Sequence, residues 1–183
     1  MTEPLLVIIT GPVGGGKSTV ALALADHFRA TGQMTAVIDL DRVYIMARQI
    51  DGYGEASIWA VARRGAAALA DSFYADGIQV VIVEGEFFTR DELETLYDAL
   101  STPVRHCFAT LAVTYQTALC HVAGDPTRGM SRDPEFLRRL YAQFEAARPF
   151  LHTVSFIIEA DHLAPGELAE MIHDAAISRS DAL

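Results

Sequence analysis

The stretch LLVIITGPVGGGKST, residues 5–19, constrains the possible folds more than any other part of the sequence. An apolar run breaks into glycines and then ends in Lys-Ser-Thr. The fixed positions of the pattern G-x-x-x-x-G-K-[ST] are occupied by Gly11, Gly16, Lys17 and Ser18. In this pattern backbone N–H groups surround a phosphate, the lysine reaches further phosphate oxygens, and the hydroxyl binds Mg²⁺. We therefore expect a strand, a phosphate-binding loop and a helix in succession.

A nucleoside polyphosphate explains why these residue types occur together. Its negative charge is attracted to the positive end of a helix that begins near Lys17, and glycines let the main chain come close because they carry no Cβ. A flexible turn with an unrelated lysine is the alternative, but it requires the flanking strand and helix to be coincidental. The residues expected to bind the nucleotide here are Gly11, Gly14, Gly15, Gly16, Lys17, Ser18 and Thr19.

Apolar runs and helical stripes alternate along the rest of the chain. The apolar runs predict strands at 5–9, 34–38, 79–83, 103–111 and 155–158. Helical spacing predicts helices from 17 to about 32, then over 56–75, 91–100, 113–122, 136–149 and 165–177. Pro149 is expected to end the fifth of these helices. The alternation predicts one α/β domain over residues 1–183, with a parallel sheet and helices on both of its faces.

Bulk properties narrow the class of function. The chain has 183 residues, of which 51% are hydrophobic and 21% charged, as in a compact globular protein. A net charge of −10 argues against sequence-independent binding of nucleic acid, which needs clustered Lys and Arg. No membrane span or signal peptide is indicated, so we expect a cytoplasmic monomer or homodimer. Cys107 and Cys120 are expected to be buried thiols rather than a disulfide.

Carboxylates follow two of the predicted strands at their C-terminal ends. Asp39 and Asp41 come after the second strand, and Glu84 and Glu86 come after the third. Ligands gather outside the carboxyl ends of the strands in open α/β sheets, so these groups are candidate catalytic or metal-binding residues. An aspartate at such a position also caps a following helix well, and a buried glutamate can be structural. The choice between Asp39 and Asp41 as a catalytic base is open, with Glu84 as the third candidate.

Arginines mark two further regions. Residues 123–134, AGDPTRGMSRDP, form the longest stretch of turn chemistry and contain Arg128 and Arg132, which are expected to clamp phosphates. Solvent-exposed loop arginines are the alternative interpretation. Arg63 is on the helix predicted over 56–75, where Trp59 shares a face with it; residues so placed are more often at the edge of the core or on the solvent face.

With these features located, the chain resembles the small P-loop kinases, such as shikimate kinase, gluconate kinase, adenylylsulfate kinase and chloramphenicol phosphotransferase. The resemblance implies a five-stranded parallel sheet in the order 2-3-1-4-5, with a lid over residues 121–134. It further implies ATP and Mg²⁺ as cofactors, a metal position near Ser18, Asp39 and Glu84, and Lys17 as a catalytic residue. Because a helix between the second and third strands often walls the acceptor pocket in this kinase group, the resemblance also implies that Arg42, Trp59 and Arg63 contact the acceptor. Where several relatives have a basic residue entering the lid, this chain has His121.

What the resemblance implies about function is ATP-dependent transfer of the γ-phosphate to a hydroxyl of a small molecule. The identity of that molecule, and the preference for ATP over GTP, stay open because the kinases of this group act on sugars, acids, antibiotics and nucleotides. A different class also fits a phosphate-binding loop: a nucleotide-dependent regulatory ATPase that acts on a protein partner.

Overall fold

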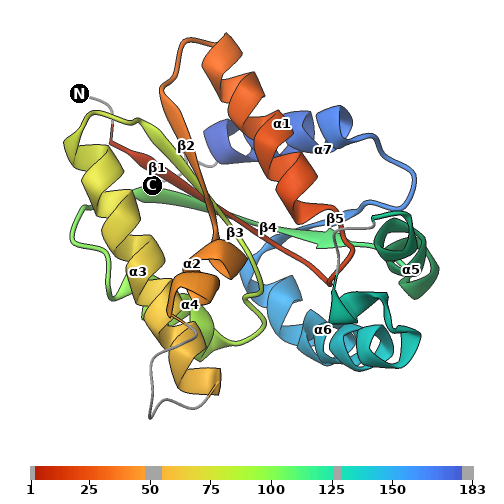
Figure 1. The fold of residues 1–183 in the computed structure, drawn as a ribbon. Coiled ribbons are helices and arrows are strands. Elements are labelled where there is room, and N and C mark those ends of the chain that lie inside the picture. Colours follow the sequence, from red (N-terminus) through yellow and green to blue (C-terminus); the bar gives the residue numbers. More distant parts are fainter. Residues whose placement is uncertain (1–2, 48–54, 126–128, 179–183) are drawn as a thin grey trace.

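A five-stranded sheet lies between two groups of helices in the computed structural model, which describes residues 3–47, 55–125 and 129–178 (Figure 1). The strands are β1 (Leu5–Thr10), β2 (Thr35–Asp39), β3 (Val80–Glu84), β4 (Arg105–Ala112) and β5 (Phe156–Glu159). Their order is β2-β3-β1-β4-β5, and all four neighbouring pairs are parallel. The predicted fold class and strand order are therefore confirmed.

The helices divide between the two faces of the sheet. They are α1 (Lys17–Ala30), α2 (Leu40–Ala47), α3 (Glu55–Ala75), α4 (Arg90–Tyr97), α5 (Tyr115–Gly124), the short 3₁₀ helix η1 (Met130–Arg132), α6 (Pro134–Val154) and α7 (Pro165–Ser178). Helices α1 and α7 pack together on one face, while α2, α3, α4 and α6 supply the core of the other. In the described part of the chain, no helix combines the length and apolar character that a membrane span requires.

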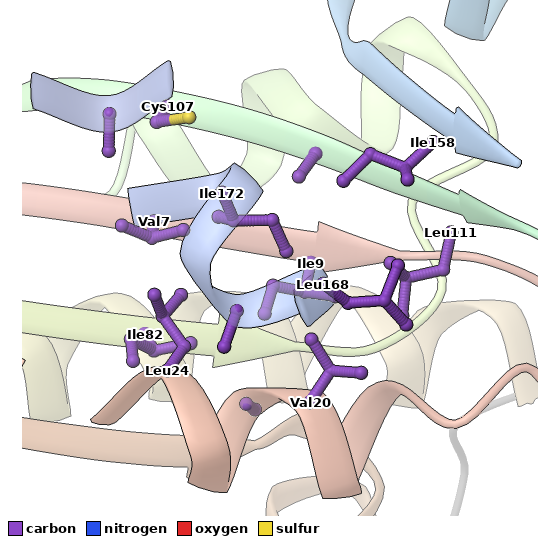
Figure 2. Packing of buried hydrophobic residues seen from close by; sticks show 14 of the residues in the cluster. Val7, Ile9, Val20, Leu24, Ile82, Cys107, Leu111, Ile158, Leu168 and Ile172 are labelled. Carbon is purple, nitrogen blue, oxygen red and sulfur yellow. The ribbon is translucent and has the colours of Figure 1, made fainter. Parts of the chain in front are cut away.

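The apolar run of β1 is continuous because both of its faces are buried. Val7 and Ile9 point into the core beneath α1 and α7, where Leu24 and Ile172 meet them (Figure 2). Leu6 and Ile8, the alternate residues, belong to the opposite core. The strand is thus fixed by packing from two sides, which holds the loop that follows it in a defined place.

Two expectations from the sequence are wrong. Helix α6 does not end at Pro149 but continues to Val154 with the proline inside it. Proline removes one backbone donor, yet Phe144, Ala147 and Leu151 keep a buried face on both sides of it, and that burial outweighs the lost hydrogen bond. Cys107 is buried as expected, but Cys120 is exposed; both are free thiols.

Candidate active site

The loop between β1 and α1 is closely packed against the neighbouring backbone. Gly14 has φ 80°, and a Cβ there would lie 2.6 Å from the carbonyl oxygen of Ala118 in α5. A Cβ on Gly11 would collide with the carbonyl of Leu111 in β4. Only glycine fits at these two positions, because both space and backbone conformation exclude a side chain. The loop is therefore held by β4 and α5 as well as by its own strand and helix.

The end of α1 that faces this loop is suited to an anion. Its N-cap is Gly16 in a left-handed conformation, no side chain caps the helix, and its first turn contains no acidic residue. The Lys17 ammonium donates hydrogen bonds to the carbonyls of Gly11, at 3.0 Å, and Pro12, at 3.1 Å. Its positive charge therefore lies against the backbone at the start of the loop. Uncapped N–H groups, a helix dipole and one lysine are the features that bind phosphate, so the loop fits a polyphosphate.

Two carboxylate side chains lie at the carboxyl ends of neighbouring strands, next to this loop. Asp39 and Glu84 are paired in register at the ends of β2 and β3, and Ile9 of β1 is also paired with Glu84. Ser18, in the first turn of α1, lies close enough to the carboxylate of Glu84 to affect its pKa. Burial raises the pKa of Glu84; Ser18 and Lys17 lower it in part, while Asp39 and Asp41 raise it. The structure therefore brings together the predicted metal-binding residues, and Lys17 with them.

This set of donors suits Mg²⁺ better than a metal that requires a complete protein cage. Among the described residues, no group of three His, Cys, Asp or Glu side chains could hold a metal by itself. Mg²⁺ is typically held by one or two carboxylates, with phosphate oxygens and water completing its shell. Ser18, Asp39 and Glu84 next to a phosphate-binding loop meet that requirement.

Asp39 and Asp41 have different surroundings. Asp39 Oδ1 accepts hydrogen bonds from the backbone N–H groups of Asp41, at 2.9 Å, and Arg42, at 3.3 Å, so it caps α2. Its other oxygen accepts a hydrogen bond from Nε of Arg42 at 3.2 Å. Asp41 is exposed in the first turn of α2. Helix capping was the alternative to a catalytic role for both aspartates, and the structure shows it for Asp39.

Arg63 is buried, with 5% of its surface exposed, and its partners lie within the protein. Its Nη2 donates to Glu92 Oε1 at 2.7 Å and to the backbone carbonyl of Glu86 at 3.0 Å, while its guanidinium lies over the ring of Phe87. Burial lowers the pKa of Arg63, and Glu92 opposes that shift. Glu92 also forms the capping box of α4 with Thr89. Arg63 is thus joined to the start of α4.

Trp59 and Arg42 lie on α3 and α2, which pack against each other. The indole of Trp59 stacks on the ring of Tyr44, with centroids 4.1 Å apart and planes 18° apart. Arg42 is 84% exposed at its side chain and pairs with Asp39. Both predicted substrate contacts therefore flank the carboxyl end of β2.

No protein-family model matches the sequence, and no curated protein matches it. Among solved structures, shikimate kinase from Acinetobacter baumannii in complex with shikimate aligns with a TM-score of 0.68 at 18% identity, over 100% of this chain and 96% of that chain. A sugar kinase from Janibacter sp. HTCC2649 aligns at 0.65 and 19% identity, over 97% of this chain and 98% of the other. Shikimate kinase from Bacteroides thetaiotaomicron aligns at 0.63 and 17% identity, over 98% and 99%.

The fold is that of the small P-loop kinases. The alignments span nearly the whole of each chain, so the similarity includes the helices around the phosphate-binding loop as well as the sheet. The resemblance predicted from the sequence is confirmed at the level of fold.

In this small P-loop kinase fold, the region expected to be a lid is partly described. Residues 121–124 complete α5, Arg132 is exposed at the end of η1, and Arg128 lies outside the described residues. Nδ1 of His121 is 2.8 Å from the carbonyl oxygen of Gly14, so the last turn of α5 is hydrogen-bonded to the phosphate-binding loop. That contact links the start of the expected lid to the loop beneath it.

Two residues near the site were not found from the sequence. Glu92 was not singled out, although Thr89 and Glu92 have the spacing of a capping box and could have indicated the start of a helix. Its pairing with Arg63 has no local signal, because the two residues come from different helices. Tyr44, the stacking partner of Trp59, lies in the first helix after β2 and was missed for the same reason.

Proposed function

We propose that this protein is an ATP-dependent kinase that transfers the γ-phosphate of ATP to a hydroxyl group of a small molecule. The observation that supports this most directly is the pairing of Glu84 in register with Asp39 at the end of the sheet, where Ser18 and Lys17 from the uncapped start of α1 are near enough to lower the pKa of Glu84. Phosphoryl transfer mainly requires positioning and neutralisation of charge, and this arrangement supplies groups for both.

Each residue of the site would then have its own role in the reaction. The loop N–H groups and Lys17 bind the phosphates of ATP, and Ser18, Glu84 and Asp39 hold Mg²⁺. When bound, Mg²⁺ neutralises charge on the phosphate oxygens. Arg132 and Arg128 are proposed to contact the phosphates from the lid side. His121 keeps the end of α5 against the loop through Gly14.

Asp41 is the proposed general base, which accepts the proton of the acceptor hydroxyl. Asp39 is less suited to that task because it is proposed to bind Mg²⁺, and its carboxylate also accepts hydrogen bonds from the helix N–H groups and from Arg42. Asp41 is exposed in the first turn of the helix that Asp39 caps, two residues further along the chain. Glu84, whose pKa Ser18 and Lys17 lower in part, is proposed to bind the metal.

Product analysis tests the function. The purified protein is incubated with Mg²⁺, a library of hydroxyl compounds and either ATP or GTP. Release of the nucleoside diphosphate is followed, and the mass of each product is measured by mass spectrometry. We expect a product heavier by one phosphate, and we expect Lys17→Ala to abolish it. Nucleotide hydrolysis that never yields a phosphorylated compound, and that a protein partner stimulates, would instead support a regulatory ATPase.

A further inference from the structure

A cavity of about 870 Å³ lies between α4, α6 and the first half of β4, where both helices pack on the same core (Figure 1). It exists because the edge strand is short. β5 pairs with β4 only from Ala109 to Ala112, so the last turns of α6, and not a strand, lie beside residues 105–108. The opposite wall is one face of α4, formed by residues three and four positions apart: Arg90, Leu93, Glu94 and Tyr97.

The walls of this cavity are largely apolar. Leu93 of α4 and Phe108 of β4 are buried beneath it, while Phe150 and Val154 of α6 are half-buried, so aromatic and methyl groups are accessible from the cavity. Ligand pockets typically have volumes of about 300–1,000 Å³ and mostly apolar walls with a few polar groups. The size and the lining therefore fit a planar aromatic compound of one or two rings.

Tyr97 supplies a polar group to the cavity. Its ring packs against the ring of His106, with centroids 5.2 Å apart, which holds the side chain in place. Burial raises the pKa of Tyr97, so the hydroxyl keeps its hydrogen at neutral pH. Within residues 3–47, 55–125 and 129–178, this hydroxyl donates no hydrogen bond to the protein. An acceptor atom on a ligand would satisfy this donor, which is favourable because a buried donor without a partner costs free energy.

The charged groups around the cavity balance one another. Arg90 and Arg105 line it together with Glu3 and Glu94. Arg90 and Glu94 form an ion pair at 3.7 Å, and both side chains are exposed to solvent. Since exposed ion pairs contribute little and neither sign of charge is in excess, the cavity attracts neither an anion nor a cation. The ligand that fits is therefore uncharged.

This cavity is separate from the phosphate-binding loop. Its floor includes His106 and Phe108 in the first half of β4, whereas Gly11 of the loop packs on the carbonyl of Leu111 near the other end of that strand. Residues in a strand advance by about 3.3 Å each, which places His106 about 16 Å from Leu111. A ligand in the cavity would thus leave the loop free for a nucleotide.

We propose that the cavity is a second binding site, for an uncharged planar aromatic compound of one or two rings that carries a hydrogen-bond acceptor. Its rings contact Phe108 and Phe150, and its acceptor atom receives the hydrogen bond of the Tyr97 hydroxyl. This inference does not depend on the proposed kinase function, because none of these three residues has a role in it.

Three probes of similar shape test the chemistry of the ligand. Quinoline has a ring nitrogen as acceptor and is uncharged at neutral pH, naphthalene has two rings without an acceptor, and 2-naphthoate adds a negative charge. Their dissociation constants are measured by NMR titration of the ¹⁵N-labelled protein, with and without saturating ATP and Mg²⁺. We expect quinoline to bind roughly 2- to 10-fold more tightly than naphthalene, the range of one neutral hydrogen bond, and not to be displaced by the nucleotide.

The same titrations can overturn the inference. Tightest binding of 2-naphthoate would show that the cavity prefers an anion. Displacement of quinoline by ATP would place the probe in the nucleotide site, and no binding of quinoline at millimolar concentration would show that the cavity takes no such ligand.

Variants of the cavity assign the binding to it. Tyr97→Phe removes only the hydroxyl, so it should lower the affinity for quinoline to that for naphthalene and leave naphthalene unchanged. Val154→Phe, which fills part of the cavity, should weaken the binding of both probes. Asp98→Asn, an exposed change at the end of α4, is the control and should alter neither. Circular dichroism checks that each variant is folded. An equal loss for both probes in Tyr97→Phe would contradict the role of the hydroxyl, and unchanged binding in Val154→Phe would contradict the location.

Discussion

Asp39 and Glu84 are partners in register at the last paired positions of β2 and β3. Two carboxylates from distant parts of the chain therefore lie on neighbouring strands at the same end of the sheet, and the pairing of the strands sets the distance between their backbones. Glu84 is in turn paired with Ile9, two residues before the phosphate-binding loop begins at Gly11. The carboxylates that are proposed to bind the metal are thus connected to the phosphate-binding loop through continuous backbone hydrogen bonding, which makes the base of the proposed site rigid.

The two aspartates near this edge should respond differently to substitution. Asp41→Asn should reduce phosphoryl transfer by about 100- to 10,000-fold, the usual contribution of a general base, while ATP binding stays unchanged. Asp39→Asn keeps the helix cap, because asparagine caps as well as aspartate, but should raise the Mg²⁺ concentration needed for activity. Asp39→Ala should also lower the free energy of unfolding by about 1 kcal/mol. Titration of activity with Mg²⁺ and chemical denaturation separate these effects, and full activity in Asp41→Asn would exclude it as the base.

A methyl group on the phosphate-binding loop should disturb nucleotide binding. In Gly14→Ala the new Cβ would meet the carbonyl of Ala118, and the positive φ adds strain, so we expect α5 to move away from the loop. The nucleotide affinity, measured by calorimetry, should fall at least about tenfold, since strain of this kind costs roughly 1–3 kcal/mol. Gly124→Ala, at the end of the same helix with open space around it, is the control. Equal affinities for the two variants would contradict the packing described here.

The buried arginine should matter for stability. Arg63→Met keeps much of the apolar stem but leaves Glu92 without its ion-pair partner, so we expect the free energy of unfolding in urea to fall by about 3 kcal/mol. Arg64→Met, at the exposed neighbouring position, should change it by less than about 0.5 kcal/mol. Adding Glu92→Gln to Arg63→Met should recover part of the loss, because the unpaired charge is removed. A double variant no more stable than Arg63→Met would argue against the ion pair as the cause.

Asp71 on α3 should make stability depend on pH at the acidic end. Burial alone would raise the pKa of Asp71, but hydrogen bonds from Ser101 and Thr102 outweigh it and hold the pKa below its usual value. This carboxylate therefore stabilises the fold above about pH 4, and the contribution is lost as the pH falls through its lowered pKa.

Asp71→Asn should accordingly cost about 1 kcal/mol near neutral pH and progressively less below about pH 4. Unfolding free energies of the variant and the wild type, measured across this range, provide the check. Asp76→Asn, an exposed change just after the same helix, controls for loss of one negative charge. A difference that stays constant with pH would show that the hydrogen bonds act without the charge.

Much of the fold could be predicted because its signals are local. The apolar run of β1 together with the glycines and Lys17 after it specifies a strand, a loop and a helix within 26 residues, Leu5 to Ala30. Runs of apolar residues also located the other four strands, with ends that differ by one or two residues. The carboxylates after β2 and β3 could then be assigned to one edge, because parallel strands end at the same side of a sheet.

What could not be predicted depends on contacts between distant segments. Pro149 is a strong local signal for a helix end, but the buried residues on both sides of it stabilise α6 beyond the proline. Arg63 was expected to contact a substrate, and only the folded chain brings it to Glu92, with which it forms a partly buried ion pair. Cys120 is exposed because α5 buries the face that carries Ala118 and Val122, and a residue two positions from each points away from that face.

Gly85 allows α2 to rest directly on the backbone after β3, since a single methyl group there would overlap Leu40. A side chain at position 85 would therefore push the start of α2, and with it Asp41, away from the end of β3. Any redesign of this end of the sheet has to keep residue 85 a glycine, and changes meant to alter the proposed acceptor site should begin on the surfaces of α2 and α3.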